Sequence, residues 1–217
     1  MKIVKKYEYK LSEETLDKDI DKFIKEAKQR AYQMDHRYGQ EGLKIIKAYF
    51  RMIKEEFKKG NYNIARICYK KLTSLLLQSE ENYFDYEDIV GRLNFKEYIA
   101  NYFTCLVKLC TIEELFNEYL EYLIVKEDYY FEEAERTIVE GLNDEQFAQF
   151  KSLLEQKAGE IKHDNYAMHD ILNFLMDIAK KKEHNEEKFR ELAMKFAPIL
   201  GYGDLKQFLE DYEDENK

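Results

Sequence analysis

The sequence contains no tryptophan, a single proline and only eight glycines among its 217 residues. Small all-β domains need turn residues at short intervals, so this scarcity argues against them and favours long helices joined by few loops. No apolar run approaches the ~20 residues of a membrane-spanning helix, and none follows the basic start as in a secretory signal. We therefore expect an all-α, cytoplasmic protein that contacts no membrane.

Cysteine is also scarce. Cys68, Cys105 and Cys110 are the only three, and no pair has the Cys-x-x-Cys spacing of a redox or zinc motif. All three lie among apolar residues, where a free thiol behaves as a small hydrophobic group. We predict buried free thiols and a reducing compartment.

Acidic residues outnumber basic ones by 44 to 35, which gives a formal net charge of −9. A negative protein repels a phosphate backbone, so we expect no nucleic-acid partner. Hydrophobic residues make up 45% of the chain, which is too many for a disordered protein and sufficient for a core. We predict a single helical domain over residues 1–217, with the irregular stretch 79–94 as the one candidate for a subdivision.

Apolar residues recur at intervals of three and four along most of the chain. This spacing predicts about nine or ten helices, arranged in antiparallel pairs because the loops between them are short. The clearest apolar stripe consists of Leu43, Ile46, Phe50, Ile53 and Phe57. Before this stripe, a long helix is expected from Ser12 to about Tyr38.

Capping residues mark several helix starts. Asn143 and Gln146 have the spacing of a capping box, in which two side chains satisfy backbone N–H groups at the helix start. Thr111 and Glu114 have the same spacing. Asn185 is expected to cap a later helix through its side-chain oxygen.

The stretch around Gly60 predicts a helical hairpin. Gly60 permits the left-handed backbone that ends one helix, and Asn61 is expected to cap the next. The pattern consists of Gly60, Asn61, Tyr62, Ala65, Tyr69 and Lys71. It resembles the turn and second helix of a tetratricopeptide repeat. This resemblance implies helix pairs stacked into a right-handed α/α superhelix whose inner face binds peptides. An irregular helical bundle is the alternative arrangement.

Two further patterns concern repetition. Ala65, Ala100, Ala134 and Ala167 recur at spacings of 35, 34 and 33 residues, close to the period of that family. A second resemblance, to the helical regions of SWIM-type zinc-finger proteins, rests on the Gly-x-Tyr-x-x-Ala-Arg pattern that begins at Gly60 and on the aromatic, acidic stretch that follows it. The zinc motif of those proteins is absent from the sequence, so no metal ligands are implied.

The stretch 79–94 has no helical period and concentrates aromatic and acidic side chains. Loops on rigid scaffolds often carry function, so we consider it the candidate partner-binding site. The candidate residues are Tyr83, Phe84, Asp85, Tyr86, Glu87, Asp88 and Arg92. They are expected at the rim of an aromatic, acidic groove that holds a peptide or protein, and the carboxylates favour a basic partner. In the alternative interpretation, the aromatic rings pack and the carboxylates remain in water.

A second candidate site lies in the segment KHDNYAMHD, where two His-Asp pairs stand six residues apart. Its residues are His163, Asp164, His169 and Asp170, with His36 as a further ligand. Together they would form the metal site of a hydrolase within a helical bundle. Six residues turn about 600° around a helix, so the two imidazoles point in different directions. Histidines of surface or capping type are the more common interpretation.

No dinucleotide-binding, P-loop, α/β-hydrolase or zincin motif occurs in the sequence, and we predict no cofactor. The favoured function is a non-enzymatic protein–protein interaction module, and the metal-dependent hydrolase is the alternative. A third interpretation, a homo-oligomer with a purely structural role, has no distinguishing sequence feature.

Overall fold

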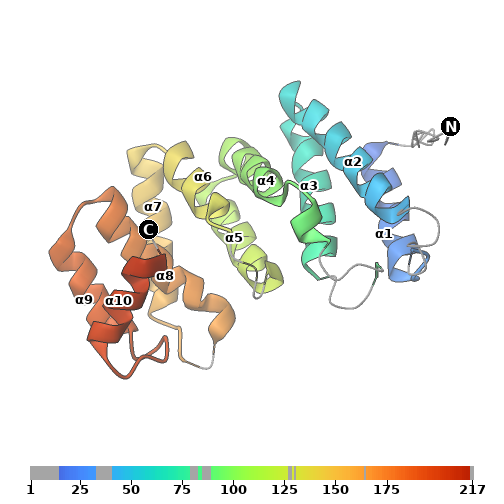
Figure 1. Ribbon diagram of the computed structural model, residues 1–217. Coiled ribbons are helices and arrows are strands. Elements are labelled where there is room, and N and C mark those ends of the chain that lie inside the picture. The colour runs from blue at the N-terminus through green and yellow to red at the C-terminus, as the bar shows by residue number, and fades with distance from the viewer. Residues whose placement is uncertain are drawn as a thin grey trace. The chain divides into compact units, whose positions relative to one another are not determined.

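The computed structural model describes residues 15–32, 41–78, 83–84, 89–126, 129, 131–163 and 165–215. These residues form ten α-helices and no β-strand, which confirms the all-α prediction (Figure 1). Each helix within these ranges is too short or too polar to cross a lipid bilayer.

The ten helices follow one another through mostly short connections. They are α1 (Leu16–Lys28), α2 (Glu41–Lys58), α3 (Tyr62–Leu77), α4 (Phe95–Leu109), α5 (Ile112–Lys126), α6 (Glu133–Gly141), α7 (Asp144–Ala158), α8 (His169–Asp177), α9 (Glu186–Phe196) and α10 (Leu205–Glu215). Short 3₁₀ turns occur at Val90–Arg92 and Tyr166–Met168, and a π turn extends α8 over Ile178–Lys182.

The described residues separate into two compact units. The first contains the chain up to Thr111 together with Val125–Gly141, and the second contains Ile112–Ile124 and the chain from Leu142 onward. Helix α5 therefore begins in the second unit and ends in the first. The residues that flank 79–94 on both sides belong to the first unit, so the two units divide at other points of the chain.

Helices α2 and α3 form the hairpin that the sequence around Gly60 predicts (Figure 1). Gly60 has a φ of +83°, in the left-handed region. The N–H of Asn61 donates to the carbonyl of Glu56, and that of Gly60 donates to Phe57, both at 3.0 Å. These two bonds form the helix-ending motif that a left-handed residue makes possible. Ala65 is fully buried near the start of α3.

The capping prediction for Asn61 is wrong. Its side chain makes no capping hydrogen bond to α3. Instead its amide donates a 2.6 Å hydrogen bond to the carboxylate of Glu56. The side chain is therefore directed back to the helix it follows.

The apolar stripe of α2 lies in the core of the first unit. Ile46, Phe50 and Ile53 are at most 1% exposed, and fully burying such side chains stabilises the fold by about 1.5–3 kcal/mol each. Helix α3 packs against α1, α2 and α4, and α4 also packs against α6. The core of this unit is thus built from contacts between helices that are near one another in the chain.

Helix α1 is shorter than predicted and ends at Lys28. Arg30 adopts a left-handed backbone with a φ of 63°, and the N–H of Ala31 donates to the carbonyl of Glu26 at 3.1 Å. This is the same ending motif as at Gly60, formed here without glycine. The predicted continuation to Tyr38 is therefore wrong at this point. Ser12, the predicted cap, lies outside the described residues.

Two predicted caps in the second unit are confirmed. Asn143 and Gln146 form both hydrogen bonds of the capping box at the start of α7. The side-chain oxygen of Asn185 accepts a 2.9 Å hydrogen bond from the N–H of Lys188 at the start of α9.

In the core of the second unit, the rings of Tyr119 and Phe150 lie 6.0 Å apart.

The four regularly spaced alanines occupy different environments. Ala65 and Ala134 are fully buried within helices, whereas Ala100 is half-buried and Ala167 lies half-buried in a 3₁₀ turn. Their spacing therefore does not mark equivalent positions.

The three cysteines are free thiols. Cys68 and Cys105 are buried as predicted, and burial raises the pKa of each to about 12. Cys110 is only half-buried, contrary to the prediction, because it follows the last residue of α4. Its sulfur accepts a 2.9 Å hydrogen bond from the guanidinium of Arg66.

Candidate functional site

The predicted site at 79–94 is described only in part. Asp85, Tyr86, Glu87 and Asp88 lie outside the described residues. Tyr83 is half-buried, and Arg92 is exposed at the end of a 3₁₀ turn. The structure therefore describes three of the seven predicted residues, namely Tyr83, Phe84 and Arg92.

Phe84 packs into the first unit instead of facing solvent. Its side chain is 5% exposed, and its ring stacks at 6.1 Å from Phe23 and at 6.2 Å from Tyr32. An isolated β-bridge joins Tyr32 to Phe84 through the backbone. Phe84 thus does not lie on an exposed rim, which corrects that part of the prediction.

The second predicted site is also described in part, since Asp164 and His36 lie outside the described residues. His163 is exposed, whereas His169 is half-buried with its ring 5.0 Å from that of Tyr166. Burial lowers the pKa of His169. Within the described ranges, no group of three or more His, Cys, Asp or Glu side chains is arranged to hold a metal ion.

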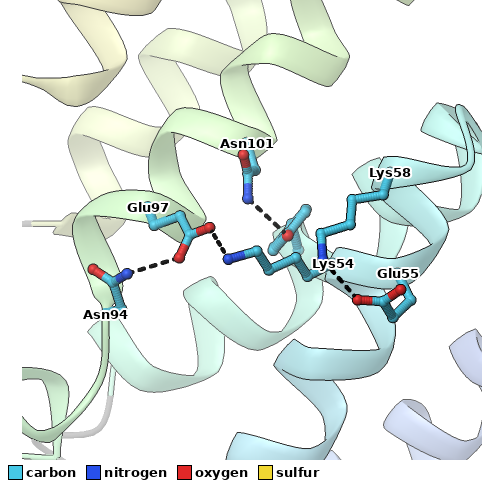
Figure 2. A network of polar contacts seen from close by, with 7 residues as sticks. Lys54, Glu55, Lys58, Asn94, Glu97 and Asn101 are labelled. Atoms are coloured by element: carbon cyan, nitrogen blue, oxygen red, sulfur yellow. Dashed lines mark hydrogen bonds and ion pairs between the residues drawn. The ribbon is translucent and has the colours of Figure 1, made fainter.

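A network of polar contacts lies where α2 meets α4 (Figure 2). Lys54 of α2 forms an ion pair with Glu97 of α4. The amide of Asn94 donates a 2.7 Å hydrogen bond to the other oxygen of the same carboxylate. One helical turn after Glu97, the amide of Asn101 donates a 3.1 Å hydrogen bond to the hydroxyl of Tyr69 on α3. The network therefore connects α2, α3 and α4.

Stacked aromatic rings accompany this network. Phe50 and Tyr98 stack with ring centroids 3.7 Å apart, and Tyr69 lies 6.3 Å from each of them. Burial raises the pKa of both tyrosine hydroxyls above the ordinary value. An aromatic pair adds about 0.5–1.5 kcal/mol beyond its buried area, whereas a partly exposed ion pair contributes about 0–1 kcal/mol. The rings therefore hold α2 against α4 at least as firmly as the Lys54–Glu97 pair.

A row of basic side chains runs along the exposed side of α2. This basic stripe consists of Lys44, Lys47, Arg51, Lys54 and Lys58. Intervals of three and four residues place the five side chains within an arc of about 80° and along about 21 Å of the helix. Each one directly follows a residue of the apolar stripe. The sequence thus contains the regular spacing of these basic residues, although a search for apolar periodicity alone does not reveal it.

Two of the five charges of the basic stripe are compensated. Lys54 pairs with Glu97, and Lys58 donates a 2.9 Å hydrogen bond to Glu55. This hydrogen bond lowers the pKa of the Glu55 carboxyl. The other three are exposed and have no ion-pair partner among the described residues. They are Lys44, Lys47 and Arg51.

A cleft of about 550 Å³ borders the basic stripe at Arg51. Apolar side chains from three helices line it, namely Leu16, Met52 and Ile64. Thr15 and charged side chains of both signs complete the lining. Such a lining can accept an apolar side chain and gives no indication of a reaction.

The described residues define a class of protein, an all-α chain in which α2 and α3 form a helical hairpin. A comparison with protein-family models, curated proteins and solved structures finds no match for this chain. The resemblance to tetratricopeptide repeats therefore stays a prediction from the pattern around Gly60.

Proposed function

We propose that this protein is a non-enzymatic interaction module whose binding face is formed by α2 and α4 of the first unit. The observation that carries this proposal is the contact between the two helices. The stacked rings of Phe50 and Tyr98, together with the Lys54–Glu97 pair, join the helices so that their exposed residues belong to one surface. As part of the same proposal, the α2–α3 hairpin acts like a tetratricopeptide helix pair, which supports a peptide-binding face.

A face supported in this way suits recognition. Because its backbone and buried rings are already ordered, a partner loses little additional conformational freedom of the module on binding. The three free thiols support a reducing, cytoplasmic compartment as part of the same proposal. The acidic stretch 79–94 stays a prediction for a second contact region, without Phe84.

Site-specific photo-cross-linking in a lysate of the source cells tests the proposal. A photoreactive amino acid replaces Lys47 on α2 in one variant and Thr104 on α4 in another. A matched control carries it at Ile67, which is 40% exposed on α3. We expect one adduct of the same mass at the first two positions and none at Ile67. Adducts at all three positions, or at none, would contradict a binding face on α2 and α4.

A further inference from the structure

We infer that the basic stripe of α2 binds an acidic helical segment of a partner protein. This inference rests on the proposed function and adds the chemistry of the partner. It differs from the basic partner that the acidic stretch 79–94 favours, because it concerns the cations of α2.

The charge of the basic stripe is the first argument. Lys44, Lys47 and Arg51 are exposed and have no ion-pair partner among the residues that the structure describes. The whole chain has a net charge of −9, yet charges beyond about 8 Å are largely screened at physiological ionic strength. A partner at the stripe therefore experiences mainly the local positive charge, which favours carboxylates.

The spacing of the basic stripe indicates a helix. Its cations follow one another at intervals of three and four residues, which correspond to rises of about 4.5 and 6 Å. A partner helix with Asp or Glu at the same intervals places one carboxylate opposite each cation. In an extended peptide, side chains on one side are about 6.6 Å apart, so after four steps such a row of side chains is about 5 Å longer than the basic stripe.

A protein fits the basic stripe better than a nucleic acid. Single-stranded nucleic acids are bound by basic grooves with exposed aromatic rings on which bases stack. Two rings next to the stripe are closed to a base, since Phe50 is 1% exposed and Tyr69 is fully buried, and the half-buried ring of Tyr98 is already stacked on Phe50. The adjacent cleft, which Arg51 borders, offers apolar side chains that suit a peptide.

Fluorescence anisotropy with a defined probe tests the inference. The probe is a fluorescein-labelled helical peptide of alanine and glutamine, with five glutamates at alternating intervals of three and four residues. The control peptide has the same composition, with its glutamates distributed around the whole helix. We expect the first peptide to bind at least tenfold more tightly. We also expect its affinity to fall when the ionic strength is raised from ~0.15 M to ~0.5 M, because the screening length shortens.

Charge-reversal variants locate the binding. The test variant is K44E/K47E/R51E, in which the three unpaired cations of the basic stripe are reversed. The matched control, K18E/K22E/K25E, reverses three exposed lysines of α1 and changes the net charge by the same amount. We expect at least a tenfold loss of probe affinity in the test variant and less than a twofold loss in the control. The milder variant K44Q/K47Q/R51Q is expected to show an intermediate loss, and thermal melting checks that each variant folds.

Three outcomes would overturn the inference. They are equal binding of the two peptides, equal losses in the α1 and α2 variants, and tighter binding of a uridine oligonucleotide than of the acidic peptide. If any of these occurs while the photoreactive groups at positions 47 and 104 still form the common adduct, the proposed function stands and the partner is not an acidic helix. If the adduct is also missing, the proposed function fails as well.

Discussion

Gly60 connects the two helices of the α2–α3 hairpin, and we predict that Gly60→Ala lowers the free energy of unfolding by about 1 kcal/mol. Its φ of +83° brings a Cβ close to the following carbonyl oxygen, which costs about 1–2 kcal/mol. A Cβ added at Gly60 meets no heavy atom within 4 Å, so no steric clash adds to this cost. Alanine also restricts the unfolded chain, which offsets about 0.4–1 kcal/mol.

Urea unfolding followed by far-UV circular dichroism measures this change. The midpoint is expected to fall at constant slope, and the melting temperature by about 2–4 °C for a chain of this size. Gly60→Asn should cost less, because asparagine adopts the left-handed region more readily. Gly203→Ala is the matched control, since its φ is not left-handed and its Cβ also meets open space. The control is expected to be neutral or slightly stabilising.

The comparison between the two alanine variants can refute the reasoning. If Gly60→Ala is as stable as Gly203→Ala, the turn between α2 and α3 does not require a left-handed residue. A loss well above ~2 kcal/mol would mean that a packing contact, and not backbone strain, fixes glycine at this position.

Three further predictions concern Phe84 and the cysteines of the first unit. Phe84→Ala should lower the free energy of unfolding by about 3–5 kcal/mol, because the ring is 5% exposed and packs against other aromatic rings. An unchanged melting temperature would contradict the burial of Phe84 and support its predicted position on an exposed rim. At pH 8, a thiol reagent should modify Cys110 before Cys68 and Cys105, whose pKa values burial raises to about 12, and equal rates for all three would contradict this burial. In the unfolded chain the same two thiols have an ordinary pKa of 9.0, so their contribution to stability should be complete below pH 9 and be lost as the pH rises towards 12. Replacing both by alanine should flatten this dependence, which urea unfolding at a series of pH values measures.

Local signals in the sequence account for most of the helices. The apolar stripe of α2, the left-handed turn at Gly60 and the caps at Asn143 and Asn185 all depend on residues within a few positions of one another. The end of α1 was not predictable in this way, because Arg30 carries no preference for a left-handed backbone. Its conformation follows from the hydrogen bonds that close the helix.

The candidate binding face depends on residues far apart in the chain. Phe50 stacks on Tyr98, and Lys54 pairs with Glu97 from a different helix. No spacing rule connects such positions. For the same reason, the burial of Phe84 against Phe23 was not evident, although packing of the aromatic residues was considered as the alternative.

The sequence by itself determined that this protein is helical, where the hairpin turns, and which residues share one side of α2. The reason is that helical periodicity and turn conformation depend on the local backbone. Only the tertiary structure decided that Phe84 is buried, that α4 joins α2 through stacked rings, and that the basic stripe has three cations without an ion-pair partner among the described residues. These features depend on which helix covers which face, and that is set by packing between distant parts of the chain.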